Sequence, residues 1–350
     1  MLVEEKYMWR SLQLALNGKG AVSPNPMVGA VIVCDGKIIG EGFHRRYGCP
    51  HAEVNAINSV KDKSLLTRAT MYVSLEPCSH YGKTPPCSDL IIEKGIPNVV
   101  IACLDPYPSV AGRGAKRLRD AGVNVASGIL EKEALELNKE FIAVQQCGMP
   151  YVYLKWAQSQ DGFIDKKRES VEDGAPAILS NSFTQMFVHK KRSEVDAIMV
   201  GTNTAVLDNP RLNSRLWHGK NPCRILLDKD LRLSTQSNLL NGEIPTIIFT
   251  EKESGIDKKN VRYISISFDE NLIKNILFRL KGEGINSLMV EGGRMLLQSF
   301  IDSCLWDEAL IEIAKRNLLD GVPAPMIKGR QVDVKKWGSS QQIYLAVTQD

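Results

Sequence analysis

Apolar and polar residues alternate over the first part of the chain in a way that predicts strands separated by helices. Apolar residues recur at near-helical spacing over residues 4–17, and the polar, glycine-rich run 17–20 ends that helix. The remaining pattern predicts strands at 30–34, 37–41, 70–74, 98–103 and 123–126, and helices at 50–57, 87–94, 114–121 and 131–144. Because strands alternate with helices, this part is predicted to be a three-layer α/β sandwich.

Proline and glycine refine these boundaries. Asp35-Gly36 stands between two apolar runs and predicts a hairpin. Two prolines flank Asn25, so residues 23–29 are expected to form a loop. Pro50 and Pro85-Pro86 suit a first helical turn, and each is expected to open a helix.

The hydrophobic pattern starts afresh after residues 147–150, where Cys-Gly-Met-Pro is typical of a hinge. We therefore predict two domains, residues 1–147 and 148–350. In the second, strands are expected at 151–157, 197–200, 224–227, 246–249, 287–290, 309–314 and 344–347, helices at 181–191, at 272–281 and after Gly293, and a loop at 202–210. This pattern predicts a second α/β domain.

Composition changes this picture little, but it excludes several classes of protein. A length of 350 residues suits two domains. No apolar run approaches the ~20 residues of a membrane span. The net charge of +4 is mild, whereas a dedicated nucleic-acid binder shows a concentrated basic patch. Acidic residues stand near the N-terminus where a signal peptide would be basic, so we expect a cytoplasmic protein without a membrane partner.

The strongest chemical signal is one histidine and two cysteines with a glutamate close by. His51, Cys78 and Cys87 can hold a zinc ion and leave its fourth position for water. Glu53 lies two residues from the imidazole and can move the protons of that water, as in zinc-dependent base deaminases. On a regular helix His51 and Glu53 would point to different sides. We therefore expect the zinc to lie off the N-terminal end of the helix, and both thiols to lie at or just before helix starts, where the helix dipole favours the thiolate.

Two other functions fit the same residues. His80 is a potential fourth ligand, and a closed site would make the zinc structural and the protein a non-catalytic nucleotide-binding protein. A nucleic-acid base deaminase with an RNA-binding second domain is the other alternative. The mild charge counts against it, as does the spacing of eight residues between Cys78 and Cys87, because the nucleic-acid deaminase signature is Cys-x-x-Cys.

Taken together, these motifs resemble the RibD family of bifunctional riboflavin biosynthesis enzymes, in which a pyrimidine deaminase is fused to a reductase. The resemblance covers nearly the whole chain; residues 23–29, 42–44 and 77–87 carry it in the first domain. It implies a cytidine-deaminase-like fold, one zinc ion per chain at the three ligands named above, and Glu53 as the proton shuttle. It also implies a substrate pocket near Asn25, His44, His80 and Lys83. Tyr107 departs from the family, which usually has asparagine there.

The second domain resembles the reductase half of that family, whose fold is similar to dihydrofolate reductase. Residues 159–162, 204–212 and 290–293 carry this resemblance, and a strand that ends in Gly292-Gly293 lets backbone N–H groups approach a phosphate. The positions that the resemblance assigns to NADPH are Ala157, Ala177, Thr204, Asp208, Lys229, Gly293, Arg294, Met295, Leu296, Leu297, Gln298 and Ser299. Those that it assigns to the substrate are Lys155, Ala175, Arg192, Leu212, Arg215 and Glu291.

Several of these assignments carry a chemical expectation. Arg192 and Arg215 are expected to hold the substrate phosphate by forked hydrogen bonds, and Lys229 to pair with the extra phosphate of NADPH. The polar segment 166–177 is expected to be a mobile flap over the reductase site.

The resemblance implies two successive reactions on one small phosphoribosylaminopyrimidine, 2,5-diamino-6-(5-phosphoribosylamino)pyrimidin-4(3H)-one. The first domain removes an amine as ammonia, and the second uses NADPH to reduce the ribosyl group to a ribityl chain. Lys155, Asp208 and Glu291 remain alternatives for the acid that opens the sugar. A homo-oligomer is expected, because such fused enzymes are commonly oligomeric, and no nucleic-acid partner is expected.

Overall fold

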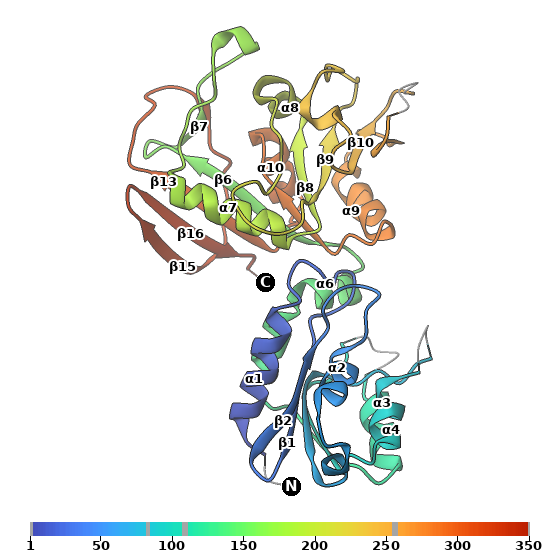
Figure 1. Ribbon diagram of the computed structural model, residues 1–350. Helices are drawn as coiled ribbons and strands as arrows, with labels where there is room; N and C mark the ends of the chain where they lie inside the picture. The colour runs from blue at the N-terminus through green and yellow to red at the C-terminus, as the bar shows by residue number, and fades with distance from the viewer. Residues whose placement is uncertain (1–2, 82–84, 107–110, 254–257, 349–350) are drawn as a thin grey trace. The chain divides into compact units, whose positions relative to one another are not determined.

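The computed structural model describes residues 3–81, 85–106, 111–253 and 258–348. The chain divides into two compact units, Met1–Gly148 and Met149–Asp350, so the division lies one residue beyond the boundary predicted at 147. Figure 1 shows a sheet flanked by helices in each unit. No helix in the described ranges is long and apolar enough to cross a membrane.

The first unit is built on a five-stranded sheet in the order β2-β1-β3-β4-β5. The strands are β1 (Gly29–Cys34), β2 (Lys37–Phe43), β3 (Thr70–Leu75), β4 (Asn98–Cys103) and β5 (Asn124–Ser127). β1 and β2 form the hairpin predicted at Asp35-Gly36, where both residues have positive φ (51° and 72°). β3, β4 and β5 run parallel to one another.

Helices cover both faces of this sheet, so the predicted three-layer sandwich is confirmed (Figure 1). The helices are α1 (Glu5–Leu16), α2 (Ala52–Ser59), α3 (Cys87–Glu93), α4 (Arg113–Asp120), α5 (Glu131–Leu137) and α6 (Lys139–Cys147), with a short 3-10 helix at Lys63–Arg68. Val31 and Val33 of β1 pack in the same core as α1. Ala30 and Ile32 point to the other face, where they pack in the core with α2. A strand buried on both faces reads as a continuous apolar run, which is why β1 and β4 are so clear in the sequence.

The single helix predicted at 131–144 is wrong, because the chain breaks at Asn138 into α5 and α6. The Asn138 side chain is 2% exposed. Its Oδ1 accepts from the Met27 backbone N–H (2.8 Å), and its Nδ2 donates to the Met27 carbonyl oxygen (3.0 Å). A buried carboxamide therefore ties the junction of the two helices to the loop that carries Asn25.

The second unit is built on a nine-stranded sheet in the order β11-β10-β9-β8-β12-β6-β13-β16-β15. The strands are β6 (Tyr151–Gln158), β8 (Ala197–Gly201), β9 (Cys223–Leu227), β10 (Thr246–Thr250), β11 (Val261–Ser265), β12 (Ser287–Val290), β13 (Glu308–Ala314), β15 (Arg330–Trp337) and β16 (Ser340–Ala346). From β11 to β13 neighbouring strands are parallel, and β16 and β15 add an antiparallel edge. A separate pair is formed by β7 (Phe163–Asp165) and β14 (Val322–Pro323).

Helices also cover both faces of this second sheet. They are α7 (Ser182–Glu194), α8 (Thr202–Asp208), α9 (Leu272–Gly282) and α10 (Arg294–Asp302), with 3-10 turns at Val171–Asp173 and Asn238–Leu240. The loop predicted at 202–210 is therefore wrong over α8. Thr202 begins α8, and its hydroxyl donates to the Leu227 carbonyl oxygen at the end of β9 (2.6 Å). Ligands of open parallel sheets bind outside the carboxyl ends of the strands, and β6, β8, β9 and β12 end at this edge.

Candidate functional site

Three potential metal ligands converge in the first unit. One ligand atom each from His51, Cys78 and Cys87 lies within 4.8 Å of the others. The His51 Nδ1 is 3.7 Å from the Cys78 Sγ and 3.4 Å from the Cys87 Sγ. His51 is the N-cap of α2, so its imidazole lies off the N-terminal end of that helix, as the sequence required. One imidazole and two thiols fit zinc.

The two cysteines reach this position differently. Cys87 is the first residue of α3, but Cys78 stands nine residues earlier in an irregular segment, so its predicted place at a helix start is wrong. Its sulfur nevertheless lies against that helix, where it accepts the Cys87 backbone N–H (3.2 Å). The hydrogen bond with Cys87 lowers the pKa of Cys78 to about 4 and raises the pKa of Cys87. A metal ion would require both sulfurs as thiolates, so binding would release the proton of Cys87.

Glu53 lies next to this group in the first turn of α2 and is 3% exposed. Burial raises the pKa of Glu53 to about 7. A carboxyl group tuned near neutrality can both take up and release a proton. His80 is exposed and lies outside the three-ligand group, which counts against a closed site with His80 as fourth ligand.

Asn25 and His44 form a second pair beside the metal ligands. His44 is 2% exposed, donates from Nδ1 to the Pro50 carbonyl oxygen (3.2 Å) and accepts at Nε2 from the Asn25 Nδ2 (3.1 Å). Burial lowers the pKa of His44, so the ring is neutral. Its edge faces the His51 ring at a centroid distance of 5.4 Å. Among the described residues nothing engages the Asn25 carboxamide oxygen, which leaves it for a ligand. The predicted contact Lys83 and the departing position Tyr107 lie outside the described residues.

Sequence reasoning gave no role to Glu76, which the structure places at the centre of the loops around the metal group. Its buried carboxylate accepts backbone N–H groups from Asp105 (3.0 Å), Gly112 (2.9 Å) and Ala115 (3.0 Å). Gly114 lies so close to the same loop that an added Cβ would meet the Pro77 carbonyl oxygen at 2.0 Å. Glu76 therefore fixes the start of α4 against the segment that carries Cys78.

The second unit contains a cavity of about 1100 Å³ at the carboxyl ends of β6, β8, β9 and β12. Most of the residues predicted to bind NADPH line it: Ala157, Ala177, Thr204, Asp208, Gly293, Arg294, Met295, Leu296, Leu297 and Ser299. Four of the predicted substrate residues line it too: Lys155, Arg192, Arg215 and Glu291.

Four predicted residues do not line the cavity. Lys229 pairs with the Glu251 carboxylate (3.2 Å), and Gln298 hydrogen-bonds the backbone of Met326. Leu212 is buried in a hydrophobic cluster, and Ala175 is exposed. Lys229 and Ala175 were counted along the family register without a matching side chain, and such counting does not determine which way a side chain points.

The cavity wall fits a dinucleotide at the junction of β12 and α10. Gly293 approaches α8 so closely that an added Cβ would lie 2.9 Å from the Thr204 Oγ1. The Nε of Arg294 is buried and has no hydrogen-bond partner among the described residues. A glycine that leaves room at a helix start, together with an unsatisfied guanidinium nitrogen, suits a diphosphate.

Arg192 is engaged by a carboxylate. Its Nε and Nη2 donate to the two carboxylate oxygens of Glu291 (2.7 and 2.5 Å), and its Nη1 donates to the Asn213 carbonyl oxygen (3.0 Å). Burial acts to raise the pKa of Glu291, but Arg192 holds it below the usual value. Among the described residues, Arg215 bonds only the neutral Asn213 side chain (2.9 Å), so of the two arginines it is the one available to a phosphate.

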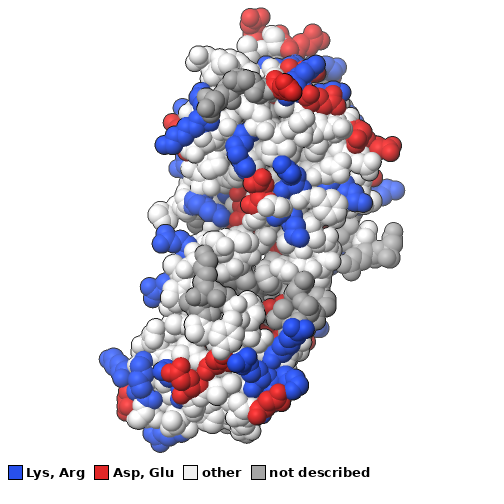
Figure 2. All heavy atoms as spheres, turned by 90° about the vertical axis from the view of Figure 1, so that its right-hand side faces the viewer, with Lys and Arg blue, Asp and Glu red and all other residues white. Residues whose placement is uncertain are grey.

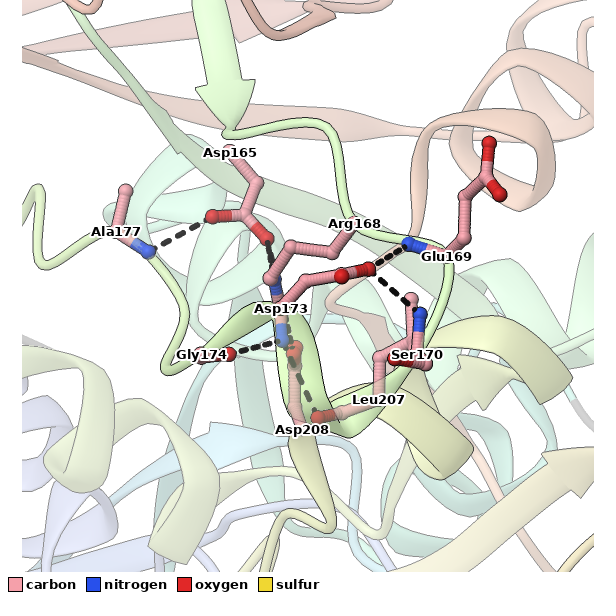
Figure 3. Close-up of polar contacts among 9 residues, drawn as sticks. All are labelled: Asp165, Arg168, Glu169, Ser170, Asp173, Gly174, Ala177, Leu207 and Asp208. Carbon is pink, nitrogen blue, oxygen red and sulfur yellow. Dashed lines mark hydrogen bonds and ion pairs between the residues drawn. The ribbon is translucent and has the colours of Figure 1, made fainter.

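Two further residues of the cavity wall were missed by sequence reasoning. His189 is buried beside Arg192 and Arg215, and burial and these cations lower its pKa to about 4. Arg168 lies in the segment predicted to be a flap and is 3% exposed. Figure 3 shows Arg168 between Asp165 and Asp208, with both of which it forms ion pairs. The Asp208 carboxylate, assigned to NADPH by the resemblance, is therefore held by this arginine.

Comparisons with known proteins agree with this geometry. Residues 1–103 match the family described as the cytidine and deoxycytidylate deaminase zinc-binding region, and residues 150–318 match the RibD C-terminal domain. Riboflavin biosynthesis protein RibD of Aquifex aeolicus is 40% identical over 326 residues, which cover 91% of this chain and 89% of that protein. The Escherichia coli RibD is 36% identical over 331 residues, covering 90% and 88%.

The chain belongs to the RibD family. It is a bifunctional enzyme with a zinc-binding deaminase half and an NADPH-dependent reductase half, so the predicted family, fold class, kind of activity and cofactors are confirmed.

Solved structures agree. A deaminase/reductase from Thermotoga maritima, named for diaminohydroxyphosphoribosylaminopyrimidine and 5-amino-6-(5-phosphoribosylamino)uracil, superposes with a TM-score of 0.89 at 36% identity and covers 98% of each chain. The RibD of Acinetobacter baumannii superposes with a TM-score of 0.89 at 32% identity and covers 99% of each chain.

Proposed function

We propose that this protein deaminates 2,5-diamino-6-(5-phosphoribosylamino)pyrimidin-4(3H)-one in a domain of residues 1–147 and reduces the ribosyl group of the product in a domain of residues 148–350. The group formed by His51, Cys78 and Cys87 beside the buried Glu53 carries this proposal, because its three protein donors leave a fourth position open. The printed name of the Thermotoga maritima relative supports the choice of substrate.

In the deaminase half, His51, Cys78 and Cys87 would hold the zinc ion, which when bound would acidify a water molecule for attack on the ring. Glu53 takes the proton of that water, delivers it to the ring nitrogen and then protonates the departing ammonia. The Asn25 carboxamide, oriented by the neutral His44, hydrogen-bonds the pyrimidine edge. His80 and Lys83 are proposed to meet the ribose phosphate.

In the reductase half, Thr204 and the start of α10 would hold NADPH, which when bound would supply the hydride. Arg215 holds the substrate phosphate, while Arg192 orients Glu291. Of the three candidate acids for opening the sugar, Asp208 is held by Arg168, and Glu291 is held ionised by Arg192. Burial lowers the pKa of Lys155, which eases proton release, and we assign the acid role to it.

One experiment tests both halves. The purified protein is given the diaminopyrimidine phosphate, and ammonia release and NADPH absorbance are followed together. We expect ammonia first and NADPH oxidation second. A nucleic-acid deaminase would instead bind RNA in a salt-sensitive way, and a non-catalytic nucleotide-binding protein would bind NADPH without oxidising it.

We also propose a cytoplasmic homo-oligomer without a nucleic-acid partner. All eight cysteines are free, and a thiolate metal site suits a reducing compartment. Figure 2 shows basic and acidic side chains interspersed on the face in view. Light scattering of the purified protein tests the oligomeric state.

A further inference from the structure

Cationic side chains line the reductase cavity, and three of them are neutralised by carboxylates. Lys167 pairs with Asp320 (2.8 Å), Arg192 pairs with Glu291 (2.5 Å), and Arg168 lies between two aspartates (Figure 3). These ion pairs neutralise those three cations, whereas no carboxylate partner is found among the described residues for Lys155, Arg215, Arg232 and Arg294, which also line the cavity. An anion entering the cavity must therefore find the cations that have no carboxylate partner.

Arg232 is such a cation, and it lies in the loop after β9. Its side chain has one partner among the described residues, the neutral Asn203, which accepts from its Nη1 (2.9 Å). Both residues line the cavity. Asn203 belongs to the first turn of α8, and the Thr202–Leu227 hydrogen bond ties that turn to the end of β9. Arg232 and Asn203 are thus held at one place on the cavity edge, with the other guanidinium N–H groups of Arg232 free.

Asp228 explains how Arg232 is presented. It follows β9 directly and carries a carboxylate. Here that carboxylate is 1% exposed and accepts the backbone N–H groups of Arg232 and Leu233 (both 2.9 Å). These hydrogen bonds hold the Asp228 carboxylate inside the loop, whereas the Arg232 side chain is exposed.

Lys229, which the sequence favoured for the extra phosphate, is paired with a carboxylate. Its ammonium pairs with Glu251 and lies 5.8 Å from the centroid of the Phe268 ring, but Lys229 is not among the residues that line the cavity. Leu227, Phe268 and Leu272 form an apolar part of the cavity wall, which suits an adenine ring. Since Gly293 and Arg294 suit the diphosphate, the adenosine end of the cofactor falls near the ends of β8 and β9.

We propose that Arg232, together with Asn203, recognises the 2′-phosphate of NADPH and sets the preference for NADPH over NADH, an inference that rests on the proposed reductase function. The guanidinium donates to the phosphate oxygens, and Asn203 holds it in place. A guanidinium suits a phosphate because it can donate two parallel hydrogen bonds to the phosphate oxygens.

The test uses the full zinc-loaded chain and two probes, 2′,5′-ADP and 5′-AMP, which differ in the 2′-phosphate. Their affinities are measured by calorimetry for the wild type and for Arg232→Gln, Lys229→Gln and Lys252→Gln. Lys252 lies 4.0 Å from Asp230 in the same region but off the cavity wall, so its variant controls for net charge. Arg232 is exposed, so its variant should fold.

We expect Arg232→Gln to lower the affinity for 2′,5′-ADP by about ten- to a hundredfold and to leave the affinity for 5′-AMP unchanged. The ratio of kcat/KM for NADPH over NADH should fall by a similar factor, and Lys252→Gln should change neither quantity. The inference is overturned if Lys229→Gln, and not Arg232→Gln, lowers the affinity for 2′,5′-ADP. It is also overturned if the wild type binds 2′,5′-ADP and 5′-AMP with equal affinity. A wild type that binds neither probe and oxidises no NADPH removes the proposed reductase function as well.

Discussion

At the scale of single residues, Glu53 is the clearest test of the deaminase chemistry. Glu53→Gln keeps the size of the side chain but cannot accept a proton. We expect ammonia release to fall by about 10²- to 10⁴-fold, because general acid–base catalysis contributes that much. The zinc content should stay at one per chain, since the three ligands are untouched.

Glu93→Gln serves as the control for Glu53, because it makes the same change at an exposed position of α3. Zinc is measured by atomic emission and ammonia by a coupled assay. If Glu53→Gln released ammonia at the normal rate, the carboxylate would not be the proton carrier.

Lys155 makes a pH-dependent prediction for the reductase half. Burial lowers the pKa of Lys155 from 10.5, although Glu291 and Glu312 oppose this. A general acid acts while protonated, so the rate should be full below this pKa and should fall as the pH rises through it. Because the pKa is lowered, the fall comes at a lower pH than for an exposed lysine.

The measurement for Lys155 is kcat for NADPH oxidation with the deaminated pyrimidine, as a function of pH. Lys155→Arg should lower kcat, because a guanidinium stays protonated and cannot give up the proton, and the residual rate should lack this alkaline limb. Ammonia release by the same preparations should keep its profile, which controls for damage to the fold. An alkaline limb that persists in Lys155→Arg would assign the titration to another group.

At the scale of elements, the segment 166–177 is pinned by one arginine. Arg168 bonds Asp165 and Asp208, and it also donates to the carbonyl oxygens of Gly174 and Leu207 (Figure 3). Arg168→Gln would leave two carboxylates without their cation. We expect the free energy of local opening to fall by about 1–3 kcal/mol.

Hydrogen exchange of residues 166–177 measures that opening. Lys167→Gln is the matched control, because its ion pair with Asp320 is exposed and should contribute nothing measurable. Equal exchange in the two variants would mean that Arg168 does not hold the segment. Faster exchange in Arg168→Gln alone would mean that the ion pairs of Arg168 hold the predicted flap in place.

Elements buried on both faces were predictable from sequence, and those at edges were not. β1 and β4 are continuous apolar runs, and both were predicted within one residue. β15 is mostly exposed and rich in charge, so it has no hydrophobic pattern to recognise. The break at Asn138 also has no local signal, because it depends on Met27, more than a hundred residues away in sequence.

Some residues of the candidate sites were also predictable from sequence, and others were not. His51, Cys78 and Cys87 were found because zinc chemistry restricts both residue type and spacing. Glu76, Arg168 and Arg232 were missed because their partners come from other elements. From sequence alone, a charged residue in a loop is expected to be solvated, and its partners become known only when the fold is known.

At the scale of the whole molecule, each unit has its own hydrophobic core and its own candidate site. The two reactions should therefore be separable by single substitutions in the full chain. Cys78→Ser removes one zinc ligand, so zinc content and ammonia release should both be lost. NADPH oxidation with the already deaminated pyrimidine should stay within about twofold, because no residue of the second site has changed.

Arg215→Gln is the reciprocal variant. It removes the arginine that is open to the substrate phosphate, so KM for the deaminated pyrimidine should rise by about tenfold or more. Zinc content and ammonia release should not change.

Two outcomes would contradict this separation of the sites. If both activities fell together in both variants, one site would depend on the other. If the Cys78→Ser protein kept zinc and ammonia release, the metal assignment would be overturned. Because each variant serves as the folding control for the other, loss of one activity with retention of the second isolates the chemistry of each half.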